Sequence, residues 1–146
     1  MFTDTHAHLD FPDFDADREE VIRRSQEEGI NSIINVGSSL KGCFAAVDLA
    51  SRYEIIYASV GIHPYSAGEI DSSGFEQLKS LLTSKKVVAI GEVGLDLYRN
   101  LSPIDTQKEL FRKFVDLSIT ANLPLIIHSR QAEEETLGIL KEKAHK

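Results

Sequence analysis

The chain has 146 residues, the size of one ordinary domain, and its hydrophobic content of 42% is enough to form a buried core. Its formal net charge of −7 excludes an overall electrostatic attraction to a polyanion, so any contact with nucleic acid depends on local basic residues or on metal ions. The single cysteine, Cys43, excludes an internal disulfide, and the absence of a leader pattern or a membrane-length apolar run predicts a cytoplasmic protein with no membrane partner.

Short apolar segments alternate with amphipathic segments along the chain. In chain order, the pattern predicts a strand over Met1–His6, a helix from Asp17 to Gly29, a strand over Ser32–Val36, a helix over Leu40–Ser51 and a strand over Ile55–Ile62. It then predicts a helix that begins near Ser73, a strand over Val87–Ile90, a helix from Ser102 to Asn122, a strand over Leu125–His128 and a helix from Ala132 to the chain end. Five strand–helix units in succession indicate a parallel sheet, because parallel strands need crossover connections.

Two α/β architectures fit such a parallel sheet, an open doubly wound sheet and a closed barrel. The doubly wound form usually carries a glycine-rich phosphate loop after its first strand. In this chain that position holds His6-Ala7-His8 instead. In both architectures the ligand site lies at the carboxyl ends of the strands. The residues that follow each strand are therefore the first candidates for function.

Candidate functional groups follow four of the five predicted strands, and they are His6 with His8, His63, Glu92 and His128. His6 and His8 are two residues apart, so in an extended chain their imidazoles point the same way and can reach one metal ion. Asp4 and Asp10 flank the pair, where they could orient an imidazole or meet the metal through water. The alternative interpretation is a pair of surface histidines in a loop.

Glu92 follows an apolar strand within Gly91-Glu92-Val93-Gly94, a segment that predicts a tight turn. A carboxylate there is costly to desolvate unless a cation or several hydrogen-bond donors compensate for it. One carboxylate can bridge two metal ions roughly 3.5–4 Å apart, which makes Glu92 the candidate catalytic residue. A salt bridge at the rim of the fold is the alternative. Asp96 is expected to pair with a cation such as Arg99 or to be solvated in a loop.

His128 ends the fifth predicted strand and is a candidate ligand for a second metal ion, with a core histidine as the alternative. Arg130 follows closely and is placed to hold an anionic group, ideally a phosphate, through bidentate hydrogen bonds. His63 precedes Pro64, which stiffens a turn beside the site. We therefore assign His63 and Arg130 to substrate binding, outside the metal coordination sphere.

Four segments of the chain resemble the TatD family of metal-dependent deoxyribonucleases. They are Asp4-Thr5-His6-Ala7-His8-Leu9-Asp10, Gly61-Ile62-His63-Pro64, Ala89-Ile90-Gly91-Glu92-Val93-Gly94-Leu95-Asp96 and Ile126-Ile127-His128-Ser129-Arg130, in the order found in the family. The resemblance implies a TIM barrel of the amidohydrolase-like superfamily that hydrolyses phosphodiester bonds of DNA at a divalent-metal site. It also implies that His6 and His8 bind one metal ion, that Glu92 bridges two, and that His128 binds the second.

The chain holds five of the eight strand–helix units of such a barrel, which needs about 250 residues when complete. The resemblance implies a further histidine after the sixth strand and an aspartate near the end of the last strands. Neither has a counterpart here, since His145 lies in a charged tail. We expect residues 1–146 to form a single domain, the N-terminal part of an incomplete (β/α)8 barrel whose C-terminal half is a missing partner.

The expected activity of the complete protein is metal-dependent hydrolysis of DNA with two divalent ions, Mg²⁺, Mn²⁺ or Zn²⁺, and the chain by itself is expected to be impaired. Exonuclease action on single strands is one form of this activity. A first alternative is a superfamily hydrolase of a small amide, lactone or phosphotriester. Such enzymes commonly use a carboxylated lysine at the end of strand four, where this chain has Glu92. A second alternative is a non-catalytic half-barrel remnant.

Overall fold

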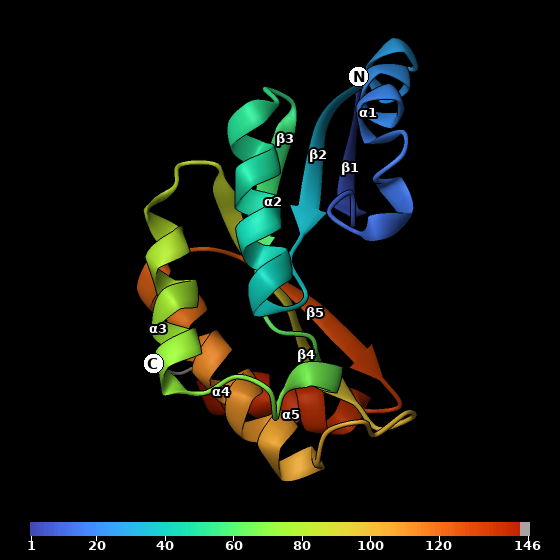
Figure 1. Ribbon diagram of the computed structural model, residues 1–146. Coiled ribbons are helices and arrows are strands. Elements are labelled where there is room, and N and C mark those ends of the chain that lie inside the picture. Colours follow the sequence, from blue (N-terminus) through green and yellow to red (C-terminus); the bar gives the residue numbers. More distant parts are fainter. Residues whose placement is uncertain (144–146) are drawn as a thin grey trace.

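Five parallel strands alternate with five α-helices in the computed structural model, which describes residues 1–143 (Figure 1). The strands are β1 (Phe2–Ala7), β2 (Ile30–Val36), β3 (Ile56–Val60), β4 (Val87–Asp96) and β5 (Leu125–Arg130). The helices are α1 (Arg18–Glu27), α2 (Leu40–Arg52), α3 (Ser72–Ser80), α4 (Ile104–Ala121) and α5 (Glu133–Lys143). Short 3-10 turns cover Pro12–Phe14, Pro64–Ser66 and Leu81–Thr83. The last part of the predicted fifth helix, including His145, lies outside the described residues.

The strands form one sheet in the order β1-β2-β3-β4-β5, so each strand pairs with the strands that precede and follow it in sequence. A doubly wound sheet reverses its strand order at the ligand site, whereas a βα barrel adds strands in sequence order. The observed order therefore selects the barrel. The sheet curls along this series, from β1 in dark blue to β5 in orange-red (Figure 1). The fold is the expected incomplete barrel of TIM type, built from five βα units.

The core lies between the sheet and the helices that cover it. Phe111 and Phe114 on α4 are fully buried, as are Ile56 on β3 and Ile90 on β4. Burying one such large apolar side chain stabilises the fold by about 1.5–3 kcal/mol. Cys43 on α2 is also fully buried, and desolvation raises the pKa of its thiol to about 12. Cys43 thus packs as a small buried hydrophobe.

The two outer strands, β1 and β5, each lack a neighbour on one side within the described residues. Apolar side chains on these strands remain in contact with solvent, and the exposed fractions are 69% for Phe2 and 38% for Ile127. Val60 on the central strand β3 is fully buried by contrast. Unpaired backbone groups beside exposed apolar side chains form edges that can accept further strands. Within residues 1–143, none of the helices combines the length and apolar character needed to span a membrane.

The predicted turn around Glu92 is wrong, because β4 continues without a break from Val87 to Asp96. The glycines in this segment serve the close approach of β5. Gly91 and Gly94 have φ values of +153° and +142°, and a Cβ added at Gly94 would lie 2.0 Å from the carbonyl oxygen of His128. A Gly-x-x-Gly segment can thus belong to a strand whose neighbour packs directly against its backbone.

Replacement of Gly94 by alanine is expected to lower the free energy of unfolding by about 3 kcal/mol or more. The new Cβ would collide with the His128 carbonyl, and the positive φ disfavours any side chain. Gly138→Ala is the matched control, since it lies in α5 with open space around the added atom and should stabilise by up to about 1 kcal/mol. Urea unfolding of both variants measures the difference, and equal stabilities would contradict the steric argument.

Candidate metal centre

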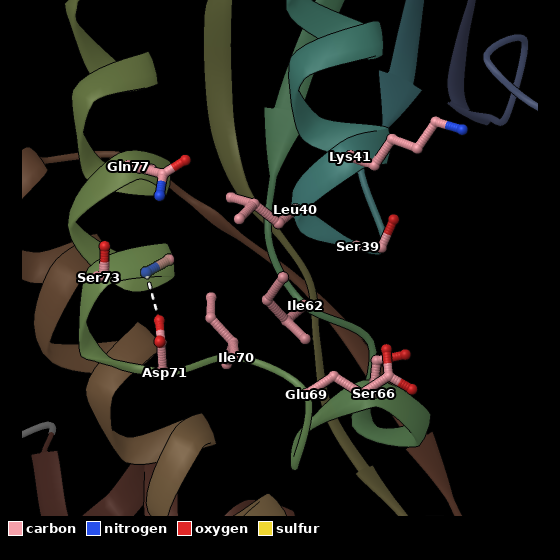
Figure 2. Close-up of a pocket in the computed structure, with 11 residues that line it drawn as sticks. Ser39, Leu40, Lys41, Ile62, Ser66, Glu69, Ile70, Asp71, Ser73 and Gln77 are labelled. Atoms are coloured by element: carbon pink, nitrogen blue, oxygen red, sulfur yellow. Dashed lines mark hydrogen bonds between the residues drawn. The ribbon is translucent and has the colours of Figure 1, made fainter.

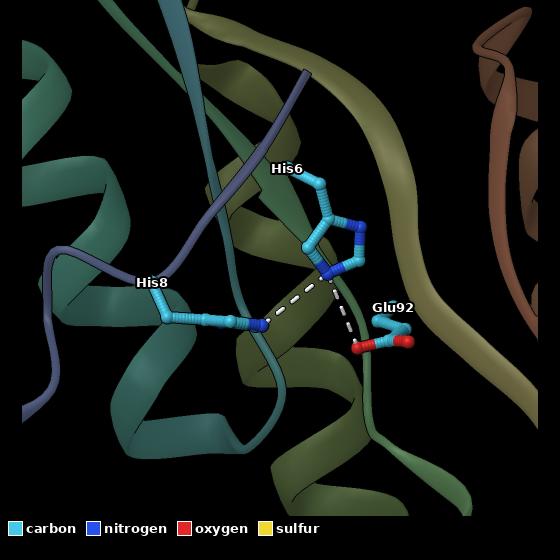
Figure 3. A group of neighbouring side chains, drawn as sticks. All are labelled: His6, His8 and Glu92. Carbon is cyan, nitrogen blue, oxygen red and sulfur yellow. Dashed lines mark hydrogen bonds and ion pairs between the residues drawn. The ribbon is translucent and has the colours of Figure 1, made fainter. Parts of the chain in front are cut away.

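His6 and His8, at the carboxyl end of β1, converge with Glu92, which lies within β4 (Figure 3). His6 lies within β1 and His8 directly follows it, so both imidazoles leave the same strand end. The Nε2 atoms of the two histidines are 3.3 Å apart, and Nε2 of His6 lies 3.6 Å from Oε2 of Glu92. These donor atoms all lie within 4.8 Å of one another. Residues that are distant in sequence thus present three possible ligand atoms to one small volume.

The arrangement of the two imidazoles fits one divalent ion. Two nitrogens bound to a tetrahedral zinc at about 2.0–2.1 Å lie about 3.4 Å apart, close to the observed separation. His8 is oriented for this role, because its Nδ1 lies 2.8 Å from the backbone carbonyl of Val36. When Nδ1–H donates to that oxygen, the lone pair of Nε2 is free for a metal ion. His8 therefore has the tautomer that a ligand needs.

Glu92 also faces a second imidazole, from β5. Its Oε1 atom lies 3.1 Å from Nδ1 of His128, whereas Oε2 faces His6. The backbone amide of Glu92 donates a hydrogen bond to the carbonyl of Gly37 at 2.9 Å. Gly37 follows β2, so this bond connects β4 to a strand that is not its neighbour in the sheet. This bond holds the carboxylate between the two edges of the sheet. One carboxylate therefore lies between histidines from opposite edges, the geometry that a bridging ligand requires.

The register of β4 and β5 explains how His128 is held. His128 lies opposite Gly94, midway between Glu92 and Asp96, which project from the same face of β4. Its Nδ1 faces Glu92, and its Nε2 lies 2.9 Å from Oδ2 of Asp96. With Nε2–H donating to Asp96, the lone pair of Nδ1 is directed to the metal centre. Asp96 thus orients this imidazole.

Asp96 is fully buried, which corrects the expectation of a solvated loop residue or a partner of the Arg99 side chain. Burial by itself would raise the pKa of this carboxyl group. Hydrogen bonds from the Arg99 backbone amide, at 2.8 Å, and from His128 outweigh that effect and hold the pKa of Asp96 below its usual value. The carboxylate remains charged beside His128. Sequence reasoning missed this role, although the spacing of Glu92 and Asp96 on one strand face carried the signal.

His63 lies beside the centre, with Nε2 3.1 Å from Nδ1 of His128. Its position near Glu92 and His128 makes it a possible ligand by distance alone. However, Nδ1 of His63 accepts a hydrogen bond from the backbone amide of Tyr65 at 3.2 Å. Burial and the nearby His128 lower the pKa of His63 to about 4, so its ring is neutral at pH 7. A neutral ring whose Nδ1 accepts carries its proton on Nε2, which suits a hydrogen-bond donor and not a metal ligand.

Three other residues are predicted to flank or serve this centre, namely Asp4, Asp10 and Arg130. Asp4 accepts a hydrogen bond from the backbone amide of His6, and Asp10 accepts one from the side chain of Asn35. Neither forms a hydrogen bond to an imidazole within the described residues, so the orienting partner of His8 is Val36 and not an aspartate. Arg130 lies at the exposed end of β5, with its guanidinium carbon 4.0 Å from the centre of the Tyr98 ring.

A separate cavity of about 490 Å³ lies between the N-terminal ends of α2 and α3 (Figure 2). Leu40, Ile62 and Ile70 line it, together with residues that cap the two helices. Ser39 accepts a hydrogen bond from the Gly42 amide and Asp71 accepts one from the Gly74 amide, the latter drawn in Figure 2. None of the predicted site residues lines this cavity. Two of its polar side chains, Ser39 and Asp71, cap the helices, and the candidate centre lies elsewhere.

Comparisons with known proteins identify the family of the chain. A family described as TatD related DNase matches residues 3–146. The metal-dependent hydrolase YabD of Bacillus subtilis is 43% identical over 143 residues, which cover 98% of this chain and 56% of YabD. The 3'-5' ssDNA/RNA exonuclease TatD of Cronobacter turicensis is 35% identical over 127 residues, 87% of this chain and 48% of that protein.

The crystal structure of YjjV, a TatD homolog from Escherichia coli, superposes with a TM-score of 0.90 at 33% identity. It matches 97% of this chain and 56% of that one. A TatD family hydrolase from Entamoeba histolytica gives a TM-score of 0.91 at 25% identity, covering 99% of this chain and 55% of that one. The chain thus spans about half the length of the relatives that it matches.

Proposed function

This chain belongs to the TatD-related DNase family, and on that premise we propose that its site hydrolyses phosphodiester bonds of DNA with the help of divalent metal ions. The observation that carries the proposal is the position of Glu92, whose two oxygens face His6 and His128 from opposite edges of the sheet. Relatives named 3'-5' ssDNA/RNA exonuclease support the end of a single strand as the substrate. A cytoplasmic location remains a prediction.

We propose the following ligands for two ions, which are Mg²⁺, Mn²⁺ or Zn²⁺. His6, His8 and Glu92 would hold the first, and Glu92 with His128 would hold the second. When bound, such ions polarise a scissile phosphate and lower the pKa of bound water toward neutrality. The residues around them position the ligands. The Val36 carbonyl fixes the tautomer of His8, and the Asp96 carboxylate fixes that of His128.

Two residues are proposed to bind the substrate. His63 carries a proton on Nε2, beside His128. Its N–H group donates a hydrogen bond to a phosphoryl oxygen, and the proton is not transferred. Arg130 lies beyond His128 on the same face of β5, because the two residues are two apart in an extended strand. Its stacking on Tyr98 leaves the guanidinium N–H groups free to bind a phosphate through a planar pair of hydrogen bonds.

We further propose that residues 1–146 form the N-terminal part of one barrel domain. The ligand set of the described residues has three imidazoles and one carboxylate for two dications, fewer donors than two four-coordinate ions require. Additional strands beside β1 or β5 would add donors at the same end of the barrel. The test is a chimera in which the C-terminal part of YabD follows this chain. Metal-dependent cleavage of a short single-stranded oligonucleotide supports the nuclease, whereas turnover of lactones alone refutes it.

Replacement of Arg130 by alanine in that chimera is expected to raise the KM for the oligonucleotide about 10- to 100-fold, because one charge-assisted phosphate contact is lost. The number of metal ions bound should not change, since Arg130 offers no lone pair to a metal. Steady-state kinetics and metal analysis on the same preparation give both values. Arg112→Ala, which removes an exposed arginine paired with Glu142, is the control and should leave KM unchanged. Loss of bound metal in Arg130→Ala would contradict the assignment.

A further inference from the structure

A hollow of about 380 Å³ opens directly beside the candidate metal centre. His8 and Glu92 of the centre line it, together with the adjacent His63. Two aromatic rings, Phe11 and Tyr65, also line it, and most of its surface is apolar. The volume lies within the range of about 300–1,000 Å³ that is usual for small-molecule sites. A ligand group in this hollow would therefore touch both the metal centre and an aromatic surface.

Phe11 is held in place by stacking on His8. Their ring centres are 4.7 Å apart and the ring planes are inclined by only 19°. The backbone supports this position, because the Phe11 amide donates to the carbonyl of His8 at 3.1 Å. The Phe11 side chain is nevertheless 39% exposed. One side of the ring is thus fixed against the metal centre while part of its surface is open to a ligand.

Tyr65 lies on the turn that follows β3 and is fixed in a similar way. Its ring stands edge-on to His63, with ring centres 4.3 Å apart and planes inclined by 68°. The hydroxyl of Ser102 donates to the Tyr65 carbonyl at 2.7 Å, which anchors this turn to the segment before α4. Both aromatic rings are therefore pre-positioned, and little conformational entropy is lost when a planar group stacks on them.

We propose that this hollow is a base-binding pocket that receives the nucleobase of the nucleotide whose phosphate lies at the metal centre. The inference rests on the proposed nuclease function. It adds a site for the nucleobase, which is the group that distinguishes a nucleotide from a simple phosphate ester. Phe11 and Tyr65 supply the stacking surfaces. Every nucleobase has a π-face, so such surfaces bind bases with little regard to sequence.

The polar groups of the pocket fit this weak selectivity. Ser38, Ser39 and Ser66 line it, and a hydroxyl can rotate to donate or to accept a hydrogen bond. Among the described residues, neither a lysine nor an arginine lines the pocket, so the phosphate is directed to the metal centre and not into the hollow. The pocket therefore binds purines and pyrimidines within a few-fold of each other, and it favours nucleotides over phosphate esters that lack a base.

The test compares two probes that share a phosphate, dAMP and 2-deoxyribose 5-phosphate. Phosphorus NMR titrations with the Mg²⁺-loaded chain give the dissociation constant of each. The expected result is about ten-fold tighter binding of dAMP, which corresponds to about 1.4 kcal/mol and lies within the range known for base–aromatic stacking. The ratio of the two constants is the readout, because any change in metal binding affects both probes alike and cancels.

Two variants locate the effect in the pocket. Phe11→Ala and Tyr65→Leu should each bring the ratio close to one, whereas Phe44→Ala should leave it at about ten. Phe44 is a matched control, since it is 44% exposed on α2 and does not line the hollow. A ratio near one in the unaltered chain overturns the base pocket and leaves the proposed function standing. A ratio that persists in both pocket variants also overturns it. If neither probe binds, the pocket is overturned, whereas the proposed function is tested separately by oligonucleotide cleavage in the chimera.

Discussion

Replacement of Glu92 by glutamine is expected to weaken binding of Mn²⁺ or Zn²⁺ by at least about 100-fold. Residues that only orient a metal ligand typically contribute 10- to 100-fold to affinity, and a direct bridging ligand contributes more. Glutamine keeps the shape of the side chain, but it loses the negative charge and one of the two oxygens. The remaining oxygen can face His6 or His128 but not both. The ligands from β1 and the ligand from β5 therefore no longer share a carboxylate.

Calorimetric titration of metal into the chain measures this loss. Glu76→Gln is the matched control, because Glu76 is exposed on α3, pairs with Lys79 and belongs neither to the candidate metal-binding groups nor to the hollow beside them. Its metal affinity should equal that of the unaltered chain. The backbone at Glu92 is unaffected by the substitution, and the hydrogen bond from its amide to Gly37 remains. Unchanged affinity in Glu92→Gln would remove the central element of the proposed site.

The alternation of strands and helices could be predicted because it follows from local hydrophobic patterns. Each predicted strand overlaps an observed one, and the absence of a glycine-rich loop after the first strand correctly favoured the barrel. The convergence of His6, His8, Glu92 and His128 was also predictable, since the carboxyl ends of parallel strands meet at one end of a barrel. Their role as metal ligands remains a prediction.

Contacts that depend on strand register could not be predicted. The interpretation of Gly91–Gly94 as a turn ended β4 too early and removed Asp96 from the strand face that it shares with Glu92. The partner of His8 is a backbone carbonyl, that of Val36, and every residue carries such a carbonyl. Only the register of β1 against β2 decides which one is used. Side-chain chemistry is visible in a sequence, whereas the choice of backbone partner is not.

The polypeptide of residues 1–146 by itself is expected to cleave single-stranded DNA at least about 10²–10⁴-fold more slowly than the chimera with a completed barrel. General acid–base catalysis alone contributes a factor of that size. Glu92 is proposed to bridge the ion held by His6 and His8 and the ion held by His128. Asp96 is fully buried and hydrogen-bonded to His128. The nearby carboxylates of Asp4 and Asp10 accept hydrogen bonds from the His6 amide and from Asn35, so the described centre offers no uncommitted carboxylate to orient an attacking water. Weak binding of one metal ion should survive, since His6 and His8 come from a single strand end.

The same polypeptide is expected to self-associate, because β1 and β5 present unpaired parallel edges next to exposed Phe2 and Ile127. Light scattering and cleavage of a labelled oligonucleotide, measured with Mg²⁺, Mn²⁺ and Zn²⁺, test both expectations on one preparation. A Glu92→Gln sample purified in parallel reveals any contaminating nuclease, since contamination would be equal in the two samples. Turnover close to that of the chimera, from a monomer and absent in Glu92→Gln, would contradict the prediction. It would mean that His6, His8, Glu92 and His128 form a sufficient catalytic centre and that the further strands serve only to cover the edges of the sheet.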